Sequence, residues 1–162
     1  MGYTAVDLAL RYPSARVLAV EPEPSNAALL RRNVASLALV EAIEGAVWPR
    51  SGRVTPVDVG KGKWGHRIVE DPRGRVRAYT VPELLGWAGV DDADLVKVDI
   101  EGSELELFSE NTEWLAGTRA LAIELHDRFR PGCREALDGA IARSGAGFRE
   151  SQVGESVVLV RD

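Results

Sequence analysis

Residues 17–33, with the sequence VLAVEPEPSNAALLRRN, constrain the fold of this chain more than any other stretch. The apolar run VLAV at its start is typical of a strand buried on both faces. Glu21 ends the run, and Pro22 and Pro24 exclude both further strand pairing and an early helix. From Ser25 onward, apolar side chains recur along one helix face, at Ala27, Leu30, Val34 and Leu37. The stretch therefore predicts a strand–turn–helix unit with a carboxylate at the carboxyl end of the strand.

The carboxylate of Glu21 has two interpretations. Ligands of open α/β sheets bind at the carboxyl ends of the strands, where an acidic side chain can accept both hydroxyl hydrogens of a ribose. Alternatively, Glu21 is a solvated residue that leaves a strand, because strand ends are often polar for that reason alone. Both interpretations stay open on this stretch alone.

Composition narrows the class of protein. A chain of 162 residues suits a single domain over residues 1–162, and 45% hydrophobic with 28% charged residues indicates a soluble globular protein. The net charge of −5 argues against a large nucleic-acid footprint. No apolar run approaches the roughly 20 residues of a membrane span, and no signal peptide is seen. Cys133 is the single cysteine, which excludes a disulfide framework. We expect a cytoplasmic protein without nucleic-acid or membrane partners.

Hydrophobic periodicity and turn residues predict the other elements. Helices are expected over residues 3–12, over 81–88, after Gly102 and over 132–144, with capping boxes at Thr80–Glu83 and Ser103–Glu106. Strands are expected over residues 41–47, 53–59, 75–81, 95–100 and 119–125, and a closing hairpin over 148–151 and 156–160. We expect 53–59 and 75–81 to form a two-stranded ribbon joined by a polar loop, 60–74. The alternation predicts an α/β fold with a mostly parallel sheet and an antiparallel C-terminal hairpin.

A second acidic strand end lies in the segment KVDIEGSE, residues 97–104. Asp99 follows a buried strand, and Gly102 allows a tight turn there. Carboxylates at this position, such as Asp99 and Glu101, can act as a base, orient a substrate hydroxyl or hold a cation. Acidic residues in a first helical turn also complement the helix dipole without any function, and Glu104 and Glu106 fit that explanation better.

Two further features carry weaker signals. His126 follows the apolar strand 119–125 and can transfer a proton near neutral pH, although a hydrogen-bonded surface histidine is the simpler explanation. The loop segment GKGKWG, residues 60–65, formally matches a dinucleotide fingerprint, but no helical pattern follows it. Its Trp64 and the nearby His66, set among basic residues, could cover a substrate, or the loop could simply be solvated. Zinc-binding spacings are absent, so no metal site is predicted, although the acidic cluster permits a divalent cation.

Several of these motifs together resemble FkbM-type S-adenosylmethionine-dependent methyltransferases. The motifs that carry the resemblance are VEPEP (20–24) with NAALLRRN (26–33), VKVDIEGSE (96–104), AIELH (122–126), GAV (45–47) with Ser51-Gly52, and YTVPELL (79–85). They agree with the family in order and spacing over nearly the whole chain. The DIEG segment is the most specific of them.

The resemblance implies a Rossmann-like class I methyltransferase sheet and methyl transfer to a hydroxyl of a small molecule, sugar or lipid-like natural product. S-adenosylmethionine would be the donor, with Glu21 on its ribose and Asp99 at the reacting centre, and Glu101 and His126 near the acceptor. The cofactor-binding residues carried over are Gly2, Glu21, Pro22, Gly45, Ala46 and Asp99. The catalytic residues carried over are Asp99, Glu101 and His126.

The chain departs from the family pattern at its start. Gly2-Tyr3-Thr4 resembles the end of the family's glycine-rich loop, so we expect the usual first strand and most of that loop to be absent. Two neighbouring strands would then have unpaired edges, which a homo-oligomer could cover. The alternative function is a non-catalytic remnant of the fold that acts as a binding or assembly module. A nicotinamide-dependent oxidoreductase is a third reading, and the absent glycine fingerprint argues against it.

Overall fold

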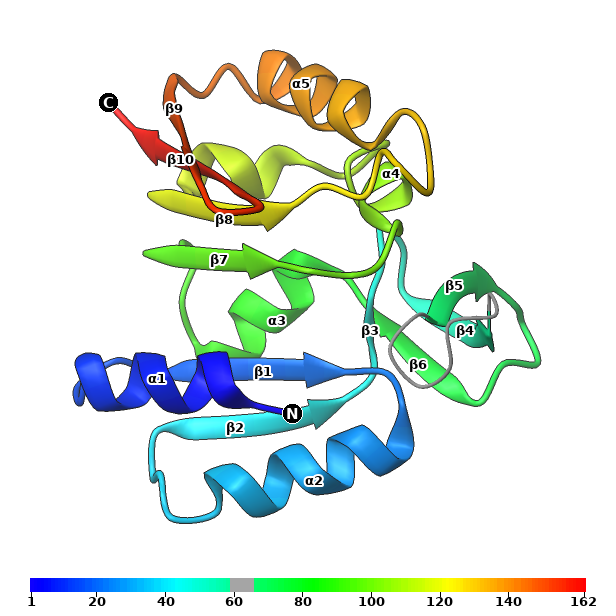
Figure 1. Cartoon of the computed structure of the whole chain (residues 1–162), viewed down its shortest axis with the longest axis vertical. Coiled ribbons are helices and arrows are strands. Elements are labelled where there is room, and N and C mark those ends of the chain that lie inside the picture. Colours follow the sequence, from blue (N-terminus) through cyan, green and yellow to red (C-terminus); the bar gives the residue numbers. More distant parts are fainter. Residues whose placement is uncertain (59–65) are drawn as a thin grey trace.

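The computed structural model describes residues 1–58 and 66–162 (Figure 1). Its helices are α1 (Tyr3–Arg11), α2 (Pro24–Val34), α3 (Val81–Ala88), α4 (Glu104–Leu107), the 3₁₀ helix η2 (Glu113–Gly117) and α5 (Cys133–Ser144). Its strands are β1 (Val17–Glu21), β2 (Val40–Glu44), β3 (Ala46–Val47), β4 (Gly52–Asp58), β5 (His66–Glu70), β6 (Val76–Tyr79), β7 (Leu95–Val98), β8 (Ala120–Glu124), β9 (Phe148–Val153) and β10 (Ser156–Arg161). The predicted α/β class is confirmed.

The strands form three groups among the described residues, with the orders β1-β2, β7-β8-β10-β9 and β3-β6-β4-β5. The pairs β1–β2, β3–β6 and β7–β8 are parallel. The pairs β8–β10, β9–β10, β4–β5 and β4–β6 are antiparallel. The prediction of a mostly parallel sheet is therefore wrong, whereas the antiparallel C-terminal hairpin is confirmed. The error arises because the strands between β3 and α3 form a small separate sheet with β3, in which β4 pairs antiparallel with both β5 and β6.

Two details of the strands β2 to β6 differ from the expectation. The single strand predicted over 41–47 divides at Gly45, so that β2 pairs with β1 and β3 pairs with β6. The expected two-stranded ribbon has an additional strand, β5, which pairs with β4 and lies within the predicted loop 60–74. The alternation of apolar and polar residues in HRIVE, residues 66–70, is too short to be recognised among the polar residues around it. Pairing with β4 is therefore what makes this segment a strand.

Helix caps test the local predictions directly. At α3 the capping box is confirmed, because the Thr80 hydroxyl accepts from the Glu83 amide and the Glu83 carboxylate accepts from the Thr80 amide. The predicted box at Ser103–Glu106 is wrong. Within the described residues, the buried Ser103 hydroxyl has no hydrogen-bond partner, and Glu106 instead pairs with Arg130.

The buried apolar residues fall into three clusters rather than one core. The largest joins β7, β8 and β10 to α4, η2 and α5, and includes Phe108, Leu115, Leu121, Ile123 and Leu137. A second lies among β3 to β6, around Trp48 and Val54. The third joins α1 and α2 to β1 and β2 through Ala5, Leu30 and Val34. The two parts that carry β1 and β7 are thus packed separately.

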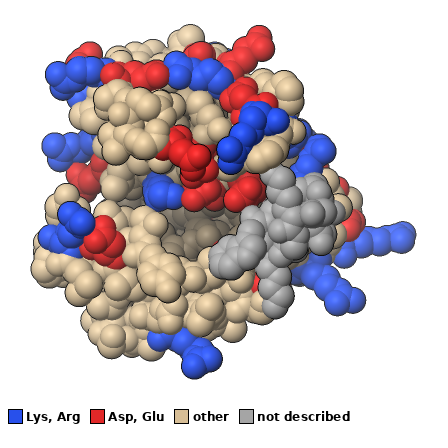
Figure 2. Space-filling model, in the orientation of Figure 1, with Lys and Arg blue, Asp and Glu red and all other residues tan. Residues whose placement is uncertain are grey.

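The boundary between those parts lies at β1 and β7. In the described parts of the chain, β1 pairs with β2 alone and β7 pairs with β8 alone, so each strand has one unpaired edge. The expected pair of unpaired edges is therefore confirmed. Figure 1 shows these two strands pointing the same way on either side of the boundary, and Figure 2 shows a hollow in this face of the molecule. Among the described residues, no helix is both long and apolar enough to cross a membrane.

Candidate functional site

The carboxyl ends of β1, β2, β7 and β8 meet at one side of the molecule, as their arrowheads in Figure 1 show. Glu21 is the last residue of β1, Asp99 directly follows β7, and His126 lies two residues beyond β8. This is the side on which ligands of α/β sheets bind. The topology therefore places the predicted polar residues of three strands at one edge.

His126 is held in place by a buried carboxylate. The residue is 3% exposed, and its Nδ1 lies 3.0 Å from Oε1 of Glu104, which is completely buried. The hydrogen bond with Glu104 raises the pKa of His126, although burial opposes the shift, and the charges of Glu101 and Glu124 add to it. The interpretation of His126 as an ordinary surface residue is therefore wrong.

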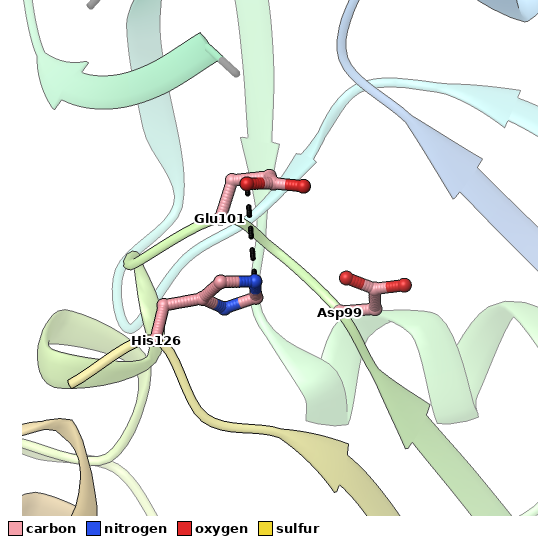
Figure 3. A group of neighbouring side chains, drawn as sticks. All are labelled: Asp99, Glu101 and His126. Carbon is pink, nitrogen blue, oxygen red and sulfur yellow. Dashed lines mark ion pairs between the residues drawn. The ribbon is translucent and has the colours of Figure 1, made fainter. Parts of the chain in front are cut away.

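Asp99 and Glu101 lie beside this imidazole (Figure 3). One ligand atom each from Asp99, Glu101 and His126 can be chosen so that all lie within 4.8 Å of one another. Nε2 of His126 is 3.8 Å from Oε2 of Glu101 and 3.6 Å from Oε1 of Glu124. Nζ of Lys97 contacts Oδ2 of Asp99 at 3.0 Å. The three residues predicted to be catalytic thus form one cluster.

The turn after β7 brings Glu101 to this place. Glu101 and Gly102 both adopt left-handed backbone conformations, with φ of 54° and 94°. Such a conformation is uncommon for a residue with a side chain and suits glycine, as the sequence predicted for Gly102. The Arg130 guanidinium donates to the Gly102 carbonyl at 3.0 Å and so supports the turn from outside. The turn directs the carboxylate of Glu101 toward His126 (Figure 3).

Glu21 uses one carboxylate oxygen in its own turn. Its Oε1 accepts from the Glu23 amide at 3.0 Å and from Nδ2 of Asn26 at 3.5 Å. Within residues 1–58 and 66–162, no hydrogen bond reaches its Oε2. The half-buried carboxylate therefore has one oxygen that a ribose hydroxyl could reach. This arrangement fits the predicted contact to the sugar of a nucleoside.

The other predicted cofactor-binding residues lie near Glu21 or support the backbone there. The Gly45 amide donates to the Glu21 carbonyl at 3.0 Å, so the ends of β1 and β2 are joined. A Cβ on Gly45 would lie 2.5 Å from the Tyr79 ring, so packing already explains this glycine. Ala46 is buried in β3, and Pro22 is half-buried after β1.

Gly2 has a structural explanation of its own, and the predicted substrate loop is largely outside the described residues. Gly2 caps α1 with a left-handed φ of 84°, and a Cβ there would lie 2.7 Å from Cδ1 of Leu30. Trp64 lies outside the described residues, and His66 is described only as the first backbone position of β5. The prediction that this loop covers a substrate stays a prediction.

Sequence reasoning missed the contact between Glu104 and His126. Glu104 was explained by the helix dipole, but its carboxylate is completely buried and contacts His126, the Ile100 amide and the Cys133 thiol. No pattern distinguishes Glu104 from Glu106, because both fall in the first turn of the same short helix. Only the packing of α4 against β8 and α5 turns the side chain of Glu104 inward.

Comparison with known proteins decides the family. The sequence model of the methyltransferase FkbM domain matches residues 2–138, which is most of the chain. The chain belongs to the FkbM methyltransferase family. The family resemblance seen in the sequence motifs is thereby confirmed.

One curated relative of this FkbM-family chain is the 2-O-methyltransferase NoeI of Sinorhizobium fredii. The two are 25% identical over 135 residues, which is 72% of this chain and 56% of NoeI. The chain thus spans little more than half the length of that relative. No solved structure matches the chain significantly.

Proposed function

We propose that this FkbM-family chain is an S-adenosylmethionine-dependent O-methyltransferase that acts on a hydroxyl of a small molecule, sugar or lipid-like natural product. The observation that carries the proposal is the meeting of Glu21, Asp99, Glu101 and His126 at the carboxyl edge of β1, β7 and β8 in a member of this family. The relative named as a 2-O-methyltransferase supports oxygen as the acceptor atom. The fold would be a Rossmann-like class I methyltransferase sheet interrupted between β1 and β7.

Glu21 would hold the donor and leave its own turn intact. Its Oε1 already accepts hydrogen bonds from the turn, and Oε2 would accept from the ribose hydroxyls. The bound cofactor would supply a methyl group on a sulfonium, which transfers by in-line displacement. The protein therefore contributes mainly by positioning the two reactants.

The cluster of Asp99, Glu101 and His126 would act on the acceptor. The new bond joins the acceptor oxygen to the methyl carbon, and the hydroxyl proton must leave to a base. Asp99 faces the donor side of the cluster in this proposal, and Glu101 or His126 would lie close to the hydroxyl. A carboxylate or an imidazole at that place can take the proton.

The donor site is tested by titrating the folded chain with S-adenosylhomocysteine in a calorimeter. We expect micromolar binding, and we expect Glu21→Ala to weaken it by at least about tenfold, because two charge-assisted hydrogen bonds are lost. Glu44→Gln is the matched control, since Glu44 ends the neighbouring strand β2 and pairs with Arg31 at the surface. Equal affinity in Glu21→Ala and the unchanged chain would contradict the ribose assignment.

A second candidate function is a non-catalytic member of the family that serves as a binding or assembly module. Among the described residues β1 and β7 each have one unpaired edge, which favours this candidate because unpaired strand edges promote association. This candidate predicts an oligomeric mass by light scattering and no thermal shift with S-adenosylhomocysteine. A monomeric mass together with a clear thermal shift would rule it out.

A further inference from the structure

One donor atom each from Asp99, Glu101 and His126 lies in the same small region (Figure 3). They lie within 4.8 Å of one another. Bonds of about 2.0–2.2 Å to a metal ion place opposite ligands about 4.2 Å apart, so a small inward movement would bring them into coordination range. The side chains of Asp99 and Glu101 are 41% and 39% exposed, which leaves them room for that movement.

His126 distinguishes this cluster from an acidic patch at the surface. Its side chain is 4% exposed, and its Nδ1 contacts the completely buried Glu104. Metal-ligating histidines almost always bond a carboxylate or carbonyl through the second ring nitrogen, which fixes the ring and raises the basicity of the ligating one. Here that contact directs Nε2 toward Glu101 and Glu124. The buried Glu104–His126 pair is therefore the second observation that points to a ligand.

The negative charge of the carboxylates in the cluster also favours binding of a cation. The carboxylates of Glu101 and Glu124 lie near Nε2 of His126, that of Asp99 belongs to the same cluster, and that of Glu104 contacts Nδ1 on the other side of the ring. The ammonium of Lys97 contacts the carboxylate of Asp99. A divalent ion would displace the proton from Nε2 and offset part of the negative charge of Asp99 and Glu101.

We propose that Asp99, Glu101 and His126 bind one divalent metal ion, with Glu104 as the positioning residue for His126. Two carboxylates and one imidazole suit a first-row ion such as Mn²⁺ or Fe²⁺, which accepts mixed oxygen and nitrogen ligands. Three ligands from the protein leave further coordination positions open. His126 is then a ligand rather than the base.

One consequence rests on the proposed function. An acceptor hydroxyl oxygen could occupy an open position on the ion, which would favour loss of its proton to a neighbouring carboxylate or to solvent. The binding of the ion itself does not depend on methyl transfer. It can therefore be measured with neither donor nor acceptor present.

The test is a titration of the full chain with Mn²⁺ after metal has been removed with EDTA. Binding is measured as the loss of the free Mn²⁺ signal in electron paramagnetic resonance. We expect one saturable site. We expect Asp99→Asn and Glu101→Gln each to weaken binding at least about tenfold, and Glu104→Gln to weaken it by about 10- to 100-fold. Glu44→Gln, the same change on an exposed carboxylate at the end of β2, should leave the affinity within about twofold.

Magnetic resonance of the imidazole rings provides a second readout. The chain has two histidines, so a His66→Gln variant leaves the ring of His126 alone in the spectrum. Substoichiometric Mn²⁺ should broaden that signal in this background, and adding Glu101→Gln should abolish the broadening. Calorimetry with S-adenosylhomocysteine then separates the two proposals, because Glu101→Gln should leave donor binding unchanged.

Two results would overturn the metal site. One is a folded, unaltered chain that binds no Mn²⁺. The other is binding that Glu44→Gln and Glu101→Gln weaken equally, which would mean that the ion is attracted by surface charge alone. Neither result would affect a donor site found by calorimetry at Glu21.

Discussion

Strands β1 and β8 have similar apolar sequences and very different surroundings. In β8, Leu121 and Ile123 are 0% exposed, whereas every residue of β1 is only half-buried. β8 lies between β7 and β10, with α5 packed over the same cluster. β1 pairs with β2 alone among the described residues and packs against α1 and α2 through a small cluster. An apolar run thus indicates a strand, but its burial depends on the neighbours it finds.

The two parts of the candidate site differ in packing in the same way as the two strands. The Glu104–His126 pair belongs to the well-packed part, where a completely buried carboxylate fixes the imidazole. Glu21 belongs to the weakly packed part, and its turn is held by local hydrogen bonds to Glu23 and Asn26. We therefore expect the part of the candidate site around His126 to be more rigid than the part around Glu21.

Replacing one leucine by alanine in each of the two strands tests the comparison most strongly. Leu121→Ala in β8 should lower the free energy of unfolding by about 2–5 kcal/mol, because it leaves a cavity in the largest cluster. Leu18→Ala in half-buried β1 should cost less than about 1.5 kcal/mol. Urea denaturation followed by circular dichroism measures both. Equal losses would mean that the two strands are equally well packed.

The Glu104–His126 pair predicts a pH-dependent difference in stability. The pKa of His126 is raised in the folded chain, mainly by Glu104, so the pair stabilises fully below the unfolded histidine pKa of about 6.5 and less as the pH rises through the folded value. Glu104→Gln should therefore cost about 1.5–3 kcal/mol at about pH 6 and less at about pH 9. Urea titrations in EDTA at the two pH values measure this. A cost that grows with pH would contradict the assigned interaction.

Thiol reactivity compares local opening in the two parts of the molecule. Cys133 is 0% exposed, and burial together with Glu104 raises its pKa to about 11, so it should resist an aromatic disulfide reagent at about pH 8 until the chain unfolds. A cysteine placed at Ala19 in β1, in a Cys133→Ala background, should react faster through local opening. Similar rates would show that β1 is as well protected as α5.

Local sequence determined most element positions. The capping box at Thr80 and the prolines after Glu21 act through neighbouring residues, so α3 and the turn before α2 could be predicted from short segments. The residues at the strand ends were also predictable, because an apolar run followed by an acidic residue is a local pattern. Asp99, Glu101 and His126 were all found in this way.

Tertiary structure decided which of those residues lie together. The strand β5, the division of residues 41–47 at Gly45 and the burial of Glu104 each depend on partners distant in sequence. Pairing and burial are long-range properties, because β-propensity mainly reports how well a segment fits its neighbours. The sequence by itself therefore determined the family and the polar residues at the strand ends. The packing of α4 against β8 and α5 determined that an inward-facing glutamate would hold the histidine of the cluster.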